Sequence, residues 1–289
     1  MKNLIQLGFA ALLSATFMTT KAQSKDTENS TLWEVSGNGL TKPSYIAGTC
    51  HIMCSQDFEI KPKVLKALEQ SDHFVMEINY TDPAEMAAMQ KMYQTDKKLS
   101  DQLSLSEAKE LDKILADYGT DLKKMDNSSS QGLYALISMK ALPCPQTEIK
   151  LYEIELLQNA IKNKKNVSGL EKVEDQMKSI NKAYHLKAVI GQLKMGKEYE
   201  ILMKEMLSAF KKEDMKSVYT LFKNDKIMNA EQEKAMLTDR NKNWAEKMPV
   251  LMKKESSFFA VGGAHLMGDN GLIQLLRAKG YTVKPVLSL

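Results

Sequence analysis

The feature that most constrains this chain is a pattern that occurs near both of its ends. GTCHIM covers residues 48–53 and GGAHLM covers residues 262–267; each has a glycine, two small residues, a histidine, an aliphatic residue and a methionine. Each motif follows a short apolar run that predicts a strand and precedes an amphipathic segment that predicts a helix. The chain therefore carries two strand–loop–helix units with a histidine at the same place in each.

Both units continue into a second predicted strand, HFVMEI (73–78) in the first and YTVKPV (281–286) in the second. A hairpin is predicted before the first motif, because LWEVSG and SYIAG flank an Asn-Gly turn. Strand–helix–strand units are normally parallel and right-handed, and ligands bind beyond the carboxyl ends of their strands. We therefore expect an α/β fold in which two GxxH-bearing strand–helix–strand halves form one sheet.

The middle of the chain, about residues 82–254, is predicted to be a large helical insertion in a single domain over residues 32–289. Within it, residues 147–165 predict a helix and NVSGLE (166–171) predicts a short strand. In the first strand–helix–strand unit, outside this insertion, residues 48–58 predict a loop. The chain has 19 methionines, among them Met86, Met89 and Met92 in a helix predicted to begin at Asp82 and Pro83, and their helical spacing indicates core filling rather than a metal-binding or calmodulin-like surface.

The first 22 residues resemble a secretory signal peptide. Lys2 precedes an apolar run over residues 4–18, and small residues stand before a possible cut after Ala22. The alternative is a membrane anchor, but this run is shorter than the roughly 20 apolar residues that span a bilayer. We expect a periplasmic or secreted protein with a flexible lead at residues 23–31 and no transmembrane segment after cleavage.

Charge argues against a nucleic-acid partner. Removal of the signal takes Lys2 and Lys21 and no acid with it, which lowers the formal net charge from +4 to +2. Nucleic-acid binding requires a strongly basic surface, because phosphate contacts provide most of its affinity.

The three cysteines predict one disulfide in an oxidising compartment. We expect Cys54 to pair with Cys144 and Cys50 to stay free, because a bridge from Cys50 would distort the GxxH loop beside it. A small Cys50–Cys54 ring and three free thiols are the alternatives.

His51 and His265 are candidate metal ligands, since each ends a glycine-led loop after a strand. Gly48 and Gly262 are candidate cofactor-binding positions, because glycine lets the backbone approach a ligand closely. Glu77 is the candidate third ligand: a charge in the apolar strand HFVMEI is costly unless it is paired or metal-bound. The alternative for Glu77 is a carboxylate that reaches water at a strand end.

Glu171 is a second carboxylate at the end of a short predicted strand. His73 and His185 are expected to be structural, because neither stands in a glycine-led loop. The sequence contains no HExxH, GxSxG, P-loop or GxGxxG pattern. This excludes the common helical zinc-protease arrangement and the usual nucleotide-binding loops.

With these residues in view, the chain resembles the TraB/GumN family, which is related to the Tiki proteases and more distantly to ChaN-like and erythromycin-esterase-like proteins. The resemblance covers nearly all of the chain after residue 31 and includes VSGLEKVEDQ, LTDRNKNW and FAVGGAHLMGDNG. It implies an α/β core of two GxxH halves with a helical middle. For the Tiki branch it implies a divalent-metal-dependent protease, with manganese or cobalt favoured over zinc.

Carried over by position, the family's motif residues fall on six side chains: His51, His265, Glu77, Glu171, Arg240 and Asn241. The resemblance implies that the first three hold one divalent ion with an open position for water. Glu171 would be a general base or a further ligand. Arg240 and Asn241 would donate hydrogen bonds to the developing oxyanion, and a solvated helix charge is the alternative for Arg240. The chain departs from the family pattern at Cys50, usually aliphatic, and in GGAH, usually GAGH.

Two functions are therefore expected. The first is a secreted metal-dependent hydrolase, with a peptide or protein as its substrate and a metal-activated water as its nucleophile. The alternative is a non-catalytic haem- or metal-binding protein of the ChaN-like type, since one fold can support unrelated functions.

Overall fold

The structure is a computed structural model that describes residues 29–287. The predicted signal peptide and most of the predicted lead lie outside these residues. The end of that lead is packed: Ser30 and Thr31 are buried, and the Ser30 hydroxyl donates a hydrogen bond to the Val286 carbonyl over 2.8 Å. The ordered fold therefore begins before residue 32.

A six-stranded sheet in the order β6-β4-β7-β2-β1-β8 forms the centre of the molecule. Its strands are β1 (Leu32–Ser36), β2 (Ser44–Thr49), β4 (His73–Met76), β6 (Asn166–Gly169), β7 (Ser257–Gly262) and β8 (Thr282–Pro285). The first four strands in the order, β6 to β2, run parallel, and β1 is antiparallel to both of its neighbours. The predicted α/β fold is confirmed, including the short strand in NVSGLE.

The two GxxH halves are interleaved at the middle of this sheet. β2 pairs with β7 in parallel, and Thr49 lies opposite Gly262. Both histidine loops therefore leave the sheet at the same edge, as the sequence predicts. Gly48 permits the contact between the loops, because a Cβ atom there would lie 2.6 Å from Cδ1 of Leu266.

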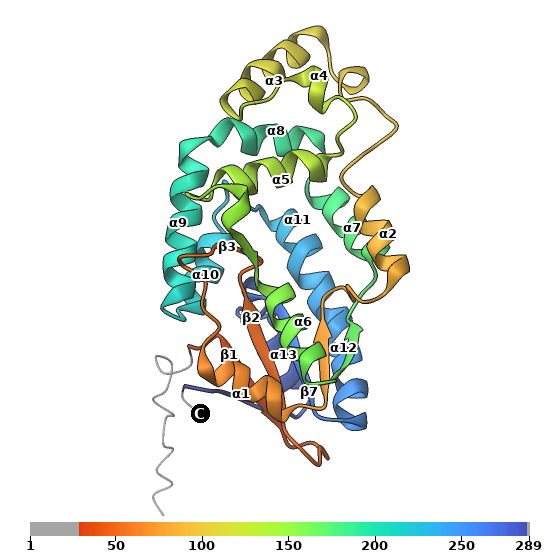
Figure 1. Cartoon of the computed structure of the whole chain (residues 1–289), viewed down its shortest axis with the longest axis vertical. Coiled ribbons are helices and arrows are strands. Elements are labelled where there is room, and N and C mark those ends of the chain that lie inside the picture. Colours follow the sequence, from red (N-terminus) through yellow and green to blue (C-terminus); the bar gives the residue numbers. More distant parts are fainter. Residues whose placement is uncertain (1–28, 288–289) are drawn as a thin grey trace, which may run out of the picture.

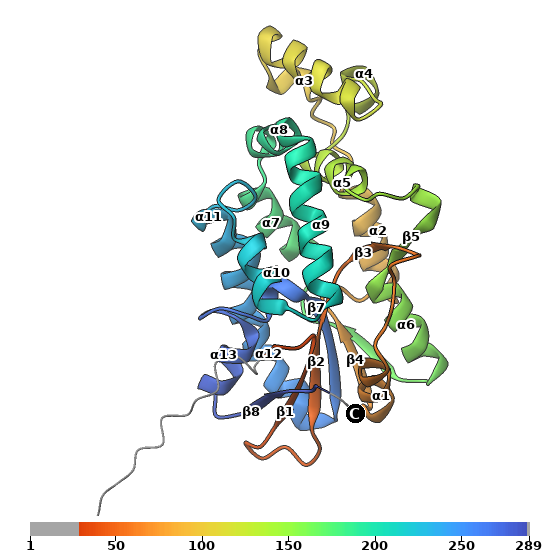
Figure 2. The same ribbon diagram turned by 90° about the vertical axis from the view of Figure 1, so that its left-hand side faces the viewer.

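Helices cover both faces of the sheet, which gives three layers in its lower half (Figure 2). One face is covered by α12 (Asp239–Lys254) and α13 (Leu272–Ala278), and the other by α1 (Pro62–Gln70) and α6 (Tyr152–Lys162). The core between the layers is apolar, and Phe74, Phe258 and Phe259 at its centre are fully buried.

The remaining helices form a second region above the carboxyl ends of the parallel strands (Figure 1). They are α2 (Pro83–Lys91), α3 (Leu105–Asp117), α4 (Leu122–Met125), α5 (Ser130–Lys140), α7 (Val173–Ala183), α8 (Leu186–Met195), α9 (Lys197–Lys211), α10 (Met215–Phe222), α11 (Ala230–Glu233) and the π-helical turn η3 (Lys234–Thr238). None of the helices in residues 29–287 has both the length and the apolarity that crossing a membrane requires.

The prediction that the methionines fill the core is confirmed for several of them but is wrong for those of α2. No residue of this helix is buried, and Met86 is 38% exposed. The helix contacts mainly α7 and lies at the side of the helical region (Figure 1). Other methionines, such as Met215 and Met248, are fully buried.

A small second sheet lies beside the first histidine, where a loop was predicted. β3 (Ile52–Cys54) pairs antiparallel with β5 (Ile149–Leu151), so the helix predicted over residues 147–165 begins only at α6. The disulfide Cys54–Cys144, with a Cα–Cα distance of 5.9 Å, brings the two segments together. This confirms the predicted pairing, and Cys50 is free.

Candidate active site

Each of the four parallel strands ends close to a residue of the candidate site. His51 follows β2, His265 lies in the short helix η4 (Gly263–His265) after β7, and Glu77 directly follows β4. Glu171 comes two residues after β6. Because parallel strands end at one edge of a sheet, the fold brings these four side chains to the same place.

The guanidinium of Arg240 lies at the centre of this group. Its Nη2 donates to Oε2 of Glu77 over 2.6 Å and to Oε1 of Glu171 over 2.7 Å, and its Nη1 lies 3.1 Å from Nε2 of His265. Nη1 also donates to the Met236 carbonyl, in the π-helical turn before α12. Arg240 is only 5% exposed, so the alternative of a solvated helix charge is wrong.

Glu171 is held by several donors. Nε1 of Trp244 donates to Oε2 of Glu171 over 3.1 Å, and Nε2 of Gln176 donates to Oε1 over 3.2 Å, in addition to the Arg240 contacts. Burial raises the pKa of Glu171, and Arg240 opposes this only in part. The carboxylate is thus fixed in place as a partner of Arg240.

Asn241 fixes the ring of His265. The Asn241 amide donates to the carbonyls of Asn270 over 2.9 Å and of His265 over 3.3 Å, so its oxygen faces Nδ1 of His265, 2.6 Å away. An amide oxygen only accepts, so Nδ1 carries the hydrogen and Nε2 keeps its lone pair. Burial, together with the charge of Arg240, lowers the pKa of His265 to about 3, and the ring is neutral at pH 7.

Glu153, which the sequence analysis missed, holds His51. Oε1 of Glu153 lies 2.7 Å from Nδ1 of His51 and accepts a second hydrogen bond from the Thr49 hydroxyl over 2.5 Å. This carboxylate raises the pKa of His51 to about 9, and the charge of Glu77 adds to the effect. The His51 side chain is 62% exposed, whereas Glu77, Glu153 and His265 are buried, so solvent reaches the site beside His51.

Glu77 is ionised in spite of its burial. Burial alone would raise the pKa of this carboxyl, but the charge of Arg240, together with that of His51, more than offsets it, and the pKa falls to about 2. Oε1 of Glu77 also accepts a hydrogen bond from the Gly262 N–H over 2.8 Å. The alternative that Glu77 reaches water at a strand end is wrong.

Comparison with known proteins shows the family of the chain. Residues 31–285 match the model of the TraB/PrgY/gumN family. The chain belongs to this family. It is 23% identical to the metalloprotease TIKI homolog of Nematostella vectensis, over 98% of this chain and 74% of that protein.

Two further relatives of this TraB/PrgY/gumN protein are metalloprotease TIKI2 of Xenopus tropicalis and metalloprotease TIKI1 of Danio rerio. The first is 23% identical over 91% of this chain and the second 22% identical over 89%. The chain spans 61% and 63% of their respective lengths. No solved structure matches the chain.

The donor set of this family member has the chemistry of a divalent-metal site. A Cβ atom added at Gly262 would lie 3.0 Å from Nε2 of His51 and 3.4 Å from Oε1 of Glu77. The same Glu77 oxygen lies 4.0 Å from Nε2 of His265. Both imidazoles are held through Nδ1, as ligating histidines usually are. The three atoms are nevertheless spread: in residues 29–287, no group of three His, Cys, Asp or Glu side chains is arranged closely enough to hold an ion.

The other two histidines of this TraB/PrgY/gumN protein are structural, as predicted. Nε2 of His73 lies 2.8 Å from the Ser168 hydroxyl on the neighbouring strand. The ring of His185 accepts a hydrogen bond from the Ala188 N–H and caps α8.

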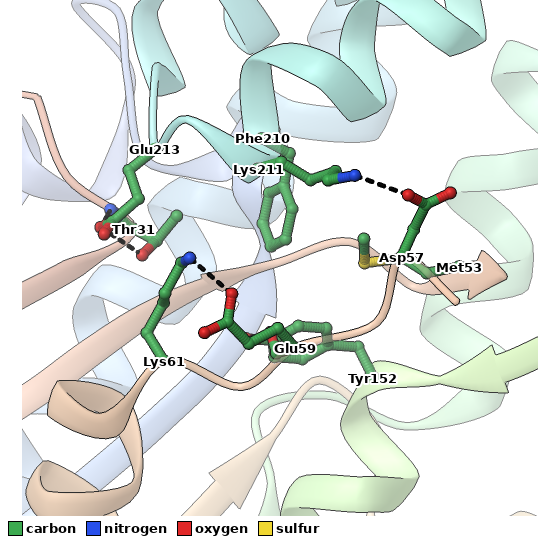
Figure 3. A pocket seen from close by; sticks show the side chains of 9 residues that line it. All are labelled: Thr31, Met53, Asp57, Glu59, Lys61, Tyr152, Phe210, Lys211 and Glu213. Carbon is green, nitrogen blue, oxygen red and sulfur yellow. Dashed lines mark hydrogen bonds and ion pairs between the residues drawn. The ribbon is translucent and has the colours of Figure 1, made fainter. Parts of the chain in front are cut away.

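A pocket of about 70 Å³ is lined partly by Met53 of β3 and contains none of the predicted site residues (Figure 3). Its polar groups pair across it: Lys61 with Glu59, Lys211 with Asp57, and Thr31 with Glu213. These mutual pairs explain the charged lining without a ligand.

Proposed function

We propose that this protein is a metal-dependent hydrolase that cleaves peptides or proteins, with His51, Glu77 and His265 as the ligands of one divalent ion. The observation that carries the proposal is that Nε2 of His51 and Oε1 of Glu77 both lie beside Gly262, with Nε2 of His265 4.0 Å from that Glu77 oxygen. The relatives named as metalloproteases support it. A bound divalent ion supplies a Lewis acid and a water of lowered pKa.

The protonation states of the three side chains suit this role to different degrees. Glu77 is ionised and His265 is neutral at pH 7, so neither loses a proton on binding a cation, but Nε2 of His265 must give up its hydrogen bond from Nη1 of Arg240. His51 must release a proton first, because its pKa is about 9.

We assign positioning roles to the residues that were expected to be the oxyanion donors and the base. The N–H groups of Arg240 contact Glu77, Glu171, His265 and the Met236 carbonyl, which occupies its donors. The amide of Asn241 is likewise used on two carbonyls. Glu171 fixes Arg240, and Arg240 in turn fixes the carboxylate of Glu77.

We also propose that the protein acts in the periplasm or outside the cell. The N-terminal sequence pattern and the Cys54–Cys144 disulfide support this location, because disulfides persist in oxidising compartments.

The test combines metal content with cleavage. The purified protein is loaded with manganese, cobalt or zinc, its bound metal is measured by mass spectrometry, and a peptide library is assayed with and without chelator. We expect about one ion per chain, and cleavage that chelator stops and manganese or cobalt restores. His51→Ala and His265→Ala should lose the bound metal and the cleavage activity, whereas His185→Ala should keep the metal and the activity.

Two outcomes would contradict the proposal. Unchanged metal content in both His51→Ala and His265→Ala would rule out this donor set. Haem uptake without cleavage under any metal would favour the ChaN-like binding function.

A further inference from the structure

We infer that Glu153, fixed by Thr49, is the positioning residue for His51. Its consequence for turnover rests on the proposed function, but its geometry does not. Glu153 lies in the first turn of α6, and the side chains that follow it on the same face, Leu156 and Ala160, are fully buried. A carboxylate on an apolar helix face is costly unless it is paired, so its contacts should account for its burial.

The contacts of Glu153 all point toward the first GxxH motif. One oxygen, Oε1, accepts from the Thr49 hydroxyl and faces Nδ1 of His51. The Thr49 hydroxyl also lies 3.1 Å from the Val261 carbonyl, so it connects β7 to the carboxylate. Glu153 is only 6% exposed and so has little contact with solvent. The ring of His51, charged or neutral, is therefore its main partner.

The backbone holds the two residues in this relation. The Tyr152 N–H donates to the His51 carbonyl over 3.1 Å, which continues the β3–β5 ladder up to the residue before Glu153. α6 and the histidine loop are therefore joined by main-chain hydrogen bonds as well as by the side-chain contact. A rotation of the His51 ring would break the Glu153 contact without any change in this backbone.

This arrangement sets the tautomer of His51. A carboxylate only accepts hydrogen bonds, so the neutral ring must carry its hydrogen on Nδ1 and present a free lone pair on Nε2, the atom that faces Gly262. Asn241 gives His265 the same tautomer, with the hydrogen on Nδ1. The two GxxH histidines are thus held by different groups, a carboxylate for His51 and an amide for His265.

The first test reads the tautomer directly in metal-free protein. Long-range ¹H–¹⁵N NMR of the histidine rings is recorded above pH 9, where His51 is neutral, for the wild type, Glu153→Leu, Glu153→Gln and Glu155→Leu. Glu155 is the matched control, because it lies in the same helical turn and pairs with Lys150 at the surface. We expect the Nδ1–H form in the wild type, in Glu155→Leu and in Glu153→Gln, which keeps an acceptor oxygen, and loss of that form in Glu153→Leu. Retention of the Nδ1–H form in a folded Glu153→Leu would overturn the inference.

The second test measures manganese affinity and, in active protein, kcat and KM separately. Loss of a residue that orients a ligand typically costs about ten- to a hundredfold in affinity or activity. We expect such a loss in kcat for Glu153→Leu, with KM unchanged, and a smaller loss for Thr49→Val, which removes one donor and preserves shape. If Glu153→Leu does not fold, Thr49→Val decides, because Glu153→Gln keeps the acceptor oxygen, and wild-type manganese affinity in Thr49→Val would overturn the inference. A tautomer change in a protein that binds no metal would support the positioning role and contradict the proposed function.

Discussion

Gly262 ends β7 beside the side chains of His51 and Glu77, and its missing side chain leaves the space that both of them face. Its φ of −52° and ψ of 135° are open to any L-residue, so glycine is not required there for backbone reasons. What glycine provides at this position is room between the candidate ligands.

Gly262→Ala should therefore impair metal binding more than folding. The added methyl group would lie 3.0 Å from Nε2 of His51, an exposed ring that can turn away at little cost to the fold. We expect manganese affinity, measured by calorimetric titration, to fall at least about tenfold, the scale found when ligand positioning is disturbed. Gly191→Ala is the control: a Cβ atom there meets nothing within 4 Å, and the change should stabilise α8 by about 0.5–1 kcal/mol. Equal affinity in Gly262→Ala and the wild type would contradict the proposed site.

Single residues also show what the sequence can and cannot reveal. His51 and His265 were predictable because each follows a strand and a glycine, a pattern carried by neighbouring residues. Glu153 was missed because its role depends on a contact with a residue far away in the chain. A usable signal did exist: its carboxylate shares a helix face with Leu156 and Ala160, where a charge needs a partner.

Among the elements, the β3–β5 pair connects the first histidine to the middle of the chain. β3 begins at the residue after His51, and β5 ends two residues before Glu153. Neither strand was predicted, since three-residue strands lack a measurable period and this pairing joins distant segments. The π-helical turn before Arg240 was not predicted either, because the spacing of its apolar residues resembles that of an ordinary α-helix.

Removing the disulfide should destabilise the protein substantially. The bridge joins residues 90 apart, and on the chain-entropy model a loop of that length contributes about 4–5 kcal/mol. We expect Cys54→Ala with Cys144→Ala to lose stability of this order in urea unfolding under oxidising conditions. In reducing buffer the wild type and the double variant should unfold at nearly the same urea concentration. A double variant as stable as the oxidised wild type would show that the bridge does not restrain the unfolded chain.

For the whole molecule, the buried charges predict how stability depends on pH in metal-free protein. Glu77 and His265 have folded pKa values of about 2 and 3, below their unfolded values of about 4.3 and 6.5. Their contributions to the free energy of unfolding are fully present above their unfolded pKa values and are lost as the pH falls through their folded pKa values. His51, raised to about 9, contributes fully below about pH 6.5, and its contribution is lost as the pH rises through 9.

We therefore expect the free energy of unfolding, measured by urea titration from acid to alkaline pH, to reach its maximum near neutral pH. His51→Gln should flatten the alkaline side and leave the acid side unchanged. A stability that increases steadily from pH 7 to pH 9 in the wild type would contradict the assignment of the Glu153–His51 pair.

The position of β7 between β2 and β4 affects when the site can exist at all. During synthesis His51 and Glu77 emerge early. β7 lies between the strands that precede these two residues, and it emerges, with His265 after it, only when residues 257–265 are made. Until then the sheet cannot close, and the candidate ligands have no common edge. A chain that stops before residue 265 therefore lacks the complete candidate donor set, so the order of the strands delays formation of the candidate site until residues 257–265 have been made.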